Sequence, residues 1–458
     1  DAGGIRFASE AKVLVGRSKA ISAESISGYL QWGVSPERTL LYPELQALPA
    51  GHAMVLQSEA RRKTWRYWPA RKALASPSVD SARQVRGLLE KSVEEHLLSD
   101  VPVASFLSGG IDSSIVTALA AQRLEKKLLT FSVGFDTAEF DESAIAHEVA
   151  QRYATEHHQI QLSQEEVIEF VTEAVAKLDL PSVDAINTYI VSRAVGEQGV
   201  KVALSGLGGD ELFGGYASFR DVPKLMLLSK LPRSLRRAIG AARKIADRLA
   251  DLPSKTDAGE IARWRRRFFT DETIARAGLP NGSAPMGSAV QLPDDFARIS
   301  WAELTGYMRE MLLRDADQMS MAVSLEMRVP FLDHELVEYV LGLPAAEKNR
   351  YPGSKGLLVE SCRDLLPASV YQRPKRGFAL PMNDWMRGAL RGFVKEGLDG
   401  AVSRQLLPQE FVEDLSASFR ARRLHWTRLW SIVVLGHFAN RSGLFRASHE
   451  DSAIHSLN

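Results

Sequence analysis

Residues 106–116 read FLSGGIDSSIV, and this stretch decides the fold. An apolar run ends at Leu107, and another begins at Ile115 after two glycines, three serines and one aspartate. This order predicts a buried strand that ends at Leu107, a tight turn, and a helix that starts near Asp112. In open α/β folds such a strand-to-helix turn lies at the carboxyl edge of the sheet, where ligands bind.

Apolar runs alternate with amphipathic stretches on both sides of this turn. The runs with the length and β-branched content of buried strands are 101–107, 128–135 and 200–206. The stretches with helical spacing between and after them are 115–127, 142–154 and 186–199, preceded by one at 81–99. This alternation predicts an α/β fold with a parallel sheet covered by helices on both faces. Residues 216–447 have mainly helical patterns.

Composition excludes several functional classes. The chain has 458 residues, with 57 Lys and Arg against 56 Asp and Glu. This nearly neutral charge balance gives no indication of a polyanionic partner. Its single cysteine, Cys362, rules out an intramolecular disulfide and fits a reducing compartment. The apolar stretch 429–436 is too short to cross a bilayer and is typical of a buried helix. We therefore expect a cytoplasmic protein without a membrane partner.

The glycine-serine turn has the composition of an anion site. Gly109 and Gly110 let backbone N–H groups approach an anion, and the helix N-terminus adds partial positive charge. Asp112 fits beside phosphates if Mg²⁺ bridges them. The turn lacks the lysine of a GxxxxGK[ST] loop and therefore differs from a P-loop. The alternative is a structural Ser or Asp cap on the helix.

A second strand exit, ALSGLGGDELFGGY at 203–216, has five glycines and two acids within the stretch 206–215. We expect Ser205 and Gly206 to form a facing wall of the nucleotide site, with Asp210 as a second carboxylate for the metal. The alternative is a turn-rich structural loop.

Five sequence blocks occur in an order that resembles the synthetase domain of glutamine-dependent asparagine synthetases. They are FLSGGIDSS, FSVGFD, ALSGLGGDELFGGY, RDADQMSMAVSLEMRVPFLDH and RPKRGFALP, and the resemblance spans about 80 to 440. It implies a fold of the ATP-pyrophosphatase (adenine nucleotide α-hydrolase-like) type with a helical C-terminal part. It also implies that ATP and Mg²⁺ activate a carboxylate as an acyl-adenylate, which ammonia then converts into an amide.

The resemblance also assigns residues. Lys375, in RPKRGF, matches the family lysine that contacts the phosphates, and it joins Asp112 and Asp210 as the catalytic and metal-binding set. The residues that match the ATP site are Leu107, Ser108, Gly109, Gly110, Asp112, Ser113, Ser114, Val133, Gly134, Ser205 and Gly206.

The acid-binding part departs from the family pattern. Leu207 stands where bacterial asparagine synthetases have a glutamate, and Val183 stands near the position of their substrate-binding arginine. Aspartate remains the first candidate substrate, but a paralogue that amidates another carboxylic acid, such as a secondary-metabolite or polysaccharide precursor, is the alternative. The candidate contacts to the acid are Asp184, Asn187, Thr188, Leu207 and Glu211.

The N-terminal residues resemble the end of a class II glutaminase domain, through FASEAKVL and LQALPAGHAMVL. Such a domain uses an N-terminal cysteine, whereas residue 1 here is Asp, and Cys362 lies within a helical stretch. We expect this polypeptide to lack glutaminase activity of its own. The predicted division is 1–69, a partial β-rich glutaminase segment of the Ntn type; 70–81, a linker; 82–447, the amide-forming domain; and 448–458, a polar tail.

Two other functions remain open. A tRNA-modifying ATP pyrophosphatase also uses an SGGxDS loop, and the basic stretches 233–248 and 263–269 could contact RNA. The GDELFGGY block and the glutaminase-like segment argue against it, so no nucleic-acid partner is expected. A non-catalytic nucleotide-binding protein is disfavoured because both acids and Lys375 are present. The expected partners are small molecules, namely ATP, aspartate or another acid, and ammonia or glutamine, with a homodimer as a candidate assembly.

Overall fold

The computed structural model describes residues 5–15, 19–42, 44–58, 61–68, 80–135, 143–242, 245–254, 256–282, 291–372 and 380–446. Lys375, most of the predicted linker and the polar tail lie outside the described residues.

A five-stranded sheet forms the centre of the fold, and all of its neighbouring strands are parallel. Its order is β6-β5-β4-β7-β8, with β4 (Val103–Phe106), β5 (Leu129–Phe135), β6 (Glu156–Leu162), β7 (Val202–Leu204) and β8 (Glu326–Arg328). The chain builds outward from β4 through β5 to β6 and then returns to the other side of β4 with β7. The direction therefore reverses between β4 and β7, which is where ligands bind in open α/β sheets.

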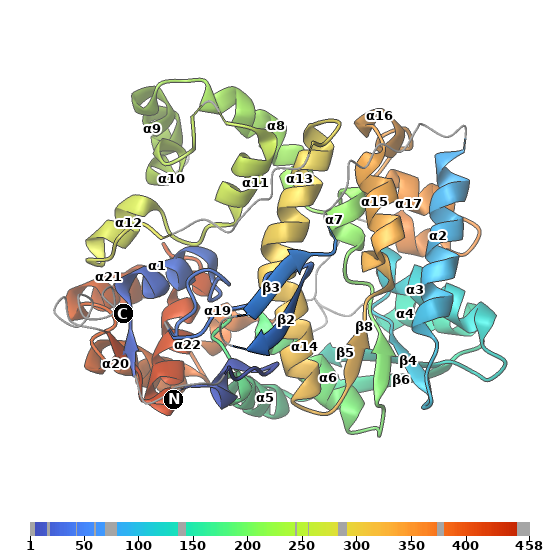
Figure 1. Cartoon of the computed structure of the whole chain (residues 1–458), viewed down its shortest axis with the longest axis horizontal. Coiled ribbons are helices and arrows are strands. Elements are labelled where there is room, and N and C mark those ends of the chain that lie inside the picture. Colours follow the sequence, from blue (N-terminus) through green and yellow to red (C-terminus); the bar gives the residue numbers. More distant parts are fainter. Residues whose placement is uncertain are drawn as a thin grey trace.

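Helices cover both faces of this sheet, as the sequence predicts (Figure 1). One face packs against α2 (Ser81–His96), α3 (Ile111–Arg123) and α4 (Ser143–Arg152), and the other against α6 (Ala185–Gly196), α14 (Arg314–Met321) and α5 (Gln164–Lys177). Strand β4 is buried on both sides, because Val103 faces the first layer and Ala104 faces the second. A strand buried on both faces explains the continuous apolar runs in the sequence.

The rest of the chain is mainly helical. The remaining helices up to residue 321 are α7 (Gly209–Phe213), α8 (Ser218–Ser229), α9 (Arg233–Ala242), α10 (Ala246–Ala250), α11 (Ala258–Arg266), α12 (Asp271–Arg276), α13 (Asp295–Glu303) and the π-helix η3 (Leu304–Leu313). After β8 come η4 (Pro330–Leu332), α15 (His334–Gly342), α16 (Ala345–Lys348), α17 (Gly356–Ser361), α18 (Ala368–Tyr371), α19 (Met382–Trp385), α20 (Arg391–Ser403), α21 (Gln409–Arg420) and α22 (Trp426–Ser442). No helix of the described ranges is long and apolar enough to cross a membrane.

The N-terminal segment is tied into this body. Strand β1 (Ala20–Ile21) pairs in parallel with β9 (Phe445–Arg446), and α1 (Ala23–Trp32) packs against the C-terminal helices. The expectation of a purely β-rich segment missed α1, whose N-cap Ser22 accepts a hydrogen bond from Ser25 N. The boundary at residue 69 stays a prediction.

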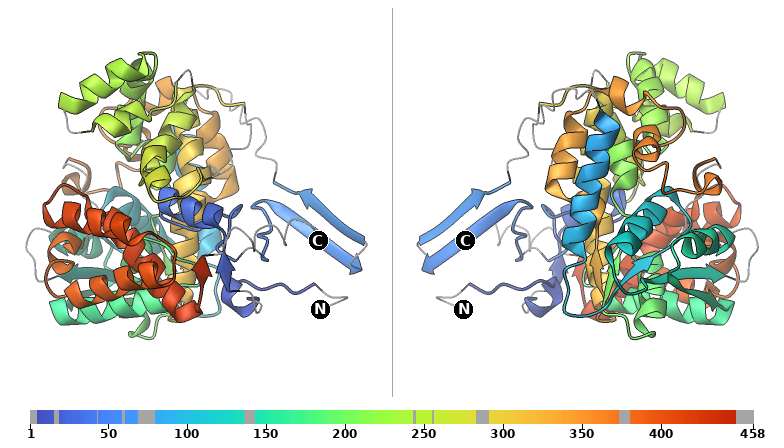
Figure 2. Two further views of the ribbon diagram at one scale, coloured as in Figure 1. Left: turned by 90° about the vertical axis from the view of Figure 1, so that its left-hand side faces the viewer. Right: turned by 90° about the vertical axis from the view of Figure 1, so that its right-hand side faces the viewer.

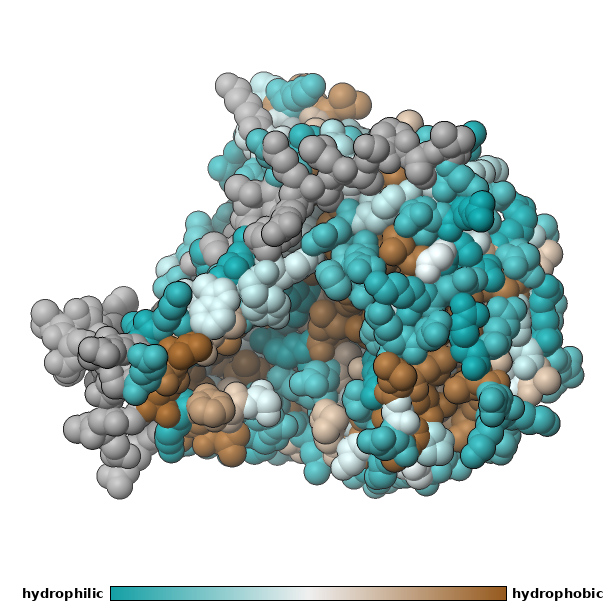
Figure 3. Space-filling model, turned by 45° about the vertical axis from the view of Figure 1, so that its right-hand side comes forward, coloured by the Kyte–Doolittle hydropathy of each residue, from teal (hydrophilic) through white to brown (hydrophobic). Residues whose placement is uncertain are grey.

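An antiparallel hairpin projects from the body (Figure 2). It consists of β2 (His52–Ser58) and β3 (Arg61–Arg66). Apolar side chains, among them Met54, Val55 and Trp65, are exposed on it, as the space-filling view also shows (Figure 3).

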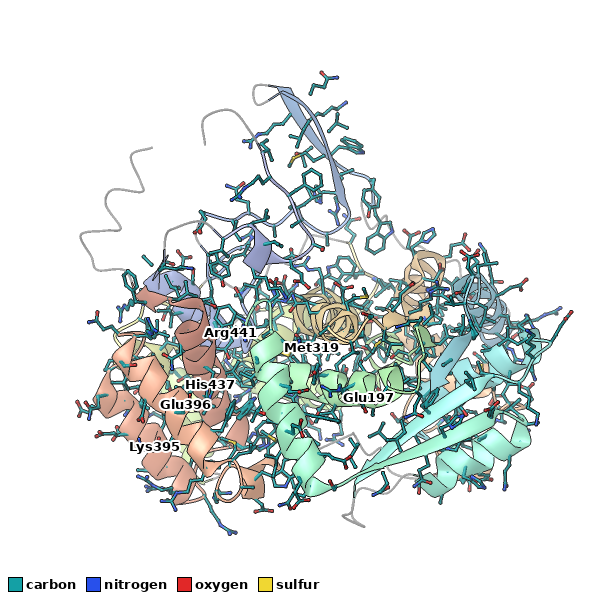
Figure 4. The ribbon with its side chains drawn as sticks, turned by 90° about the horizontal axis from the view of Figure 1, so that it is seen from below. Glu197, Met319, Lys395, Glu396, His437 and Arg441 are labelled. Atoms are coloured by element: carbon teal, nitrogen blue, oxygen red, sulfur yellow. The ribbon has the colours of Figure 1, made fainter. Side chains whose placement is uncertain are left out.

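Helix α22 joins the C-terminal helices to the sheet layer. Its Arg441 donates hydrogen bonds of 2.6 Å to the carbonyl oxygens of Val175 and Leu178 at the end of α5 (Figure 4). One turn earlier, His437 contacts the carbonyl oxygen of Phe393 on α20 at 2.8 Å. These contacts fix α20 and α22 relative to the sheet.

Helices α20 and α22 approach each other through glycines, which generates a stability prediction. A Cβ at Gly436 would collide with the Gly397 carbonyl and lie 2.8 Å from Ala401 N, both on α20. We expect Gly436→Ala to lower the free energy of unfolding by about 1–3 kcal/mol, because the two backbones must separate. Gly392→Ala, on the exposed side of α20 where a Cβ meets nothing within 4 Å, should instead be neutral or stabilising. Thermal denaturation of both variants tests this, and equal shifts would contradict it.

Candidate active site at the β4–β7 switch point

The first loop forms a strand-to-helix turn at the carboxyl end of β4. Helix α3 begins at Ile111, within one residue of the predicted start, and Gly109 has a left-handed φ of 76°. The N-cap is Gly110, which makes no side-chain cap hydrogen bond. The alternative of a Ser or Asp cap therefore does not describe this turn, and Asp112 is directed elsewhere.

Two hydroxyls lie against the turn. The Oγ atoms of Ser108 and Ser113 are 3.0 Å apart, and Ser113 Oγ also donates to the carbonyl oxygen of Gly110 at 3.2 Å. The first turn of α3 adds backbone N–H groups that have no partner within the helix. This combination can bind a polyanion such as the phosphates of a nucleotide.

The second loop packs directly onto the first. It leaves β7 at Leu204, turns at Gly208 with a φ of 106°, and enters α7. A Cβ at Gly206 would lie 2.8 Å from Ser113 N and 2.9 Å from Asp112 Cβ, so a larger residue would push the loops apart. Glycine at 206 is therefore required for the close approach.

Asp112 and Asp210, one from each loop, converge on the ammonium of Lys355. The distance from Lys355 Nζ to Asp210 Oδ1 is 2.6 Å, and the same nitrogen forms an ion pair with Asp112 Oδ2. The lysine side chain is only 4% exposed. Burial opposes its charge, but the two carboxylates outweigh burial and raise the pKa of Lys355. The two acids predicted to share a metal ion therefore lie close together, on one lysine ammonium, and the metal itself stays a prediction.

Lys355 was not predicted from the sequence. It precedes α17 with a left-handed φ of 57°, a conformation that is costly for a residue with a side chain and is often found at functional sites. The signal was present, because Lys355 is the one charged residue in the run from Tyr351 to Val359. Its pairing with acids 243 and 145 positions away could not be derived from local pattern.

A magnesium ion fits the donors at this point when it arrives with phosphates. Mg²⁺ is usually bound by one or two carboxylates, with water and phosphate oxygens as the other ligands. Asp112 and Asp210 supply two carboxylates within reach of one cation. No group of three or more His, Cys, Asp or Glu side chains in the described ranges could hold a metal.

A chain of polar contacts leads away from Asp210. The neighbouring Glu211 is buried and accepts a 2.7 Å hydrogen bond from Tyr216 Oη. The Arg266 guanidinium lies over the rings of Tyr216 and Tyr307, at 4.5 and 3.9 Å from their centroids. Tyr307 Oη in turn donates to Asp184 Oδ2 at 2.6 Å. Burial, with a smaller contribution from Asp210, raises the pKa of Glu211 to about 7.

This chain ends at a partly open cavity of 340 Å³. Two predicted acid-binding residues, Asp184 and Asn187, line it. Thr188 lies next to Asn187 on α6 without lining the cavity, and Leu207 lies in the second loop, where its N–H is 3.4 Å from Ser205 Oγ. Glu211 does not line the cavity, but it follows Asp210 in the sequence and accepts the hydrogen bond of Tyr216.

The remaining predicted residues lie near the same edge of the sheet. Leu107 is fully buried directly after β4, and Val133 and Gly134 are partly exposed near the end of β5. Their assignment to the adenine remains a prediction. Cys362 is buried, and burial raises its pKa to about 12, so its thiol is not a nucleophile at neutral pH.

The carboxylate–lysine cluster should be needed for stability. Lys355→Met leaves Asp112 and Asp210 facing each other without a cation, which we expect to cost about 3–5 kcal/mol of unfolding free energy. Lys348→Met is the matched control, because Lys348 is equally buried but its Nζ has no hydrogen-bond partner among the described residues. Burial already lowers the pKa of Lys348 to about 8, so its removal should be neutral or stabilising. Chemical denaturation at pH 7 measures both, and similar losses would contradict the prediction.

The raised pKa of Glu211 predicts a specific pH dependence. The folded state holds a proton on this carboxyl up to about pH 7, whereas the unfolded chain releases it near its ordinary value of 4.5. Glu211 therefore destabilises the fold increasingly as pH rises from 4.5 to 7, by up to roughly 3 kcal/mol. Glu211→Gln should gain stability over the wild type at pH 8 but not at pH 4.5. The exposed Glu165→Gln is the control, and a parallel pH profile for all three proteins would refute the assignment.

Comparison with known proteins identifies the family. The family model described as Asparagine synthase matches residues 84–440. A Mycobacterium tuberculosis protein described as a candidate asparagine synthetase [glutamine-hydrolyzing] is 33% identical over 94% of this chain and 70% of its own length. Asparagine synthetase [glutamine-hydrolyzing] 1 of Bacillus subtilis is 28% identical over 94% of this chain and 71% of its own. Amidase chyE of Penicillium rubens is 28% identical over 87% of this chain and 68% of its own length. The structure confirms the parallel α/β sheet and the helical C-terminal part, and this chain belongs to the asparagine synthase family of carbon–nitrogen ligases.

Proposed function

We propose that this chain uses ATP and Mg²⁺ to convert a carboxylic acid into its amide. A carboxylate oxygen of the acid attacks the α-phosphorus of ATP, and the bond to pyrophosphate breaks, giving an acyl-adenylate. Ammonia then attacks the acyl carbon, AMP leaves with the electron pair of the broken C–O bond, and the excess proton passes to solvent. The observation that carries this proposal is the convergence of Asp112 and Asp210 on one cation at the switch point.

Each part of the site has a task in this scheme. The turn at Ser108–Ser114 supplies hydroxyl and N–H donors for the departing pyrophosphate, and a magnesium ion on the two aspartates would neutralise phosphate charge. Lys355 adds a buried cation beside the same anions. Lys375 is assigned to the phosphates by its sequence block.

The acid is aspartate or a different carboxylic acid, and ammonia derived from glutamine is the proposed nitrogen source. Two positions favour a different acid. Val183 is buried and lines the cavity where a substrate-binding arginine was expected, and Leu207 replaces the expected glutamate. Neither side chain can pair with the α-carboxylate or α-ammonium group of aspartate.

Acid-dependent exchange of pyrophosphate into ATP tests the reaction. Asp112→Asn and Asp210→Asn should each lower the exchange rate by about 100-fold or more, because each removes a charge that acts on the phosphates. The folds should survive, since Lys355 keeps one carboxylate partner in each variant. Asp100→Asn, at an exposed position, is the matched control. Exchange that persists in both site variants would exclude this centre as the place of adenylation.

A further inference from the structure

The cavity at the far end of the polar chain from Asp210 is large and has walls from distant parts of the sequence. Its 340 Å³ is more than twice the roughly 150 Å³ at which an engineered apolar cavity binds benzene. Trp32 comes from the end of α1, Val183 precedes α6, Met311 lies on the π-helix η3, and Trp426 begins α22. A π-helix is rare and is frequently found at functional sites.

Most of the lining is apolar. Large aliphatic and aromatic side chains dominate it, among them Trp32, Val183, Phe268, Met311, Met382 and Trp426. Pockets for small molecules typically combine such a surface with a few polar groups that fix orientation.

Each charged side chain of the lining has a partner or a compensating charge within the protein, although the buried Nη2 of Arg266 has no hydrogen-bond partner among the described residues. Asp184 accepts from Tyr307, Arg266 Nε is 2.7 Å from Glu303 Oε2, and Glu310 pairs with Arg309. The positive charge of Arg263 is offset by the nearby carboxylates of Asp257 and Glu260. A free aspartate would bring three charges into this space, where they would lose hydration, and the unpaired Arg266 Nη2 could compensate one carboxylate at most.

The polar end of the cavity leads to the reaction centre. Tyr307 and Arg266 line the cavity, and their contacts continue through Tyr216 and Glu211 to Asp210. An acid whose body fills the cavity would therefore direct its carboxylate along this wall toward the magnesium and the α-phosphate.

We propose that the amidated substrate is a carboxylic acid with an apolar body, aromatic or branched aliphatic, and that this cavity holds the body. This rests on the proposed function and specifies its substrate class. The N-terminal segment helps to form the cavity wall. The carbonyl oxygen of Gly33 accepts a hydrogen bond from Val183 N at 2.9 Å, and that of Gln31 accepts one from Phe268 N at 2.8 Å. These hydrogen bonds position two lining residues.

Gly306 offers a way to fill the cavity without disturbing the core. It lies on η3 among the lining residues, and a Cβ there would meet no atom within 4 Å. Gly306→Ala and Gly306→Leu therefore occupy increasing parts of the space. Gly392→Leu, at an equally open glycine on the exposed side of α20, is the matched control.

The first experiment compares acids in the pyrophosphate exchange assay with the wild-type chain. The panel contains aspartate, glutamate and glucuronate against phenylacetate, 3-phenylpropanoate, indole-3-acetate and 4-methylpentanoate. We expect exchange with members of the apolar group at a kcat/KM at least about 10-fold above that of aspartate, the discrimination that a single methylene contact can supply. Exchange confined to aspartate or glucuronate would overturn the substrate class and leave the proposed function standing.

The second experiment measures the glycine variants with the best acid. Gly306→Leu should raise the KM for that acid about 10-fold or more, and Gly306→Ala should give a KM between those of the wild type and Gly306→Leu. The KM for ATP and the melting temperature of both variants should stay near those of Gly392→Leu. An unchanged KM for the acid, or a loss confined to amide formation with exchange intact, would show that the cavity does not hold the acid. If no acid supports exchange while the chain binds ATP, the proposed function itself fails.

Discussion

The placement of two carboxylates against each other at the β4–β7 edge is the constraint on which the site depends. Asp112 and Asp210 repel each other, and their loops come together because Gly206 leaves no side chain between them. Lys355 compensates the repulsion from a third segment, and its own burial is tolerated only because both acids surround it. The reversal of strand order at this point lets loops from neighbouring strands meet there.

The site extends beyond the phosphate loops through a continuous polar wall. Contacts among four side chains link Asp210 to the cavity, namely those of Glu211, Tyr216, Arg266 and Tyr307. Each of these side chains has a partner on a different element, so displacement of one disturbs the next. In the proposed reaction these contacts would hold the acid-binding region in a fixed relation to the metal-binding region, as in-line attack on a phosphorus requires.

Sequence reasoning found the parts of the fold with strong local signals. The buried strands β4, β5 and β7 are dense in apolar and β-branched residues, and the glycine turns mark their ends. It missed β6, whose sequence EHHQIQL is largely polar because this edge strand is mostly unburied, and β8, which has three residues. The switch-point aspartates were predicted from their loops, but Lys355 was not, because a partnership across the fold leaves no periodic trace.

The loops and the cavity can change independently, because they contact different parts of the reactants. In the proposed reaction the loops act on the phosphates and the metal, whose chemistry is the same for every acid, whereas the cavity holds the body of the acid. The packing of Val183 shows how the apolar wall of the cavity is maintained. It packs beside Gly33, where a Cβ would lie 2.8 Å from a Val183 methyl, and that glycine's carbonyl binds its N–H. An arginine at 183 would have to displace this segment, so the apolar character of the cavity is maintained by the packing of α1 as well as by the lining side chains.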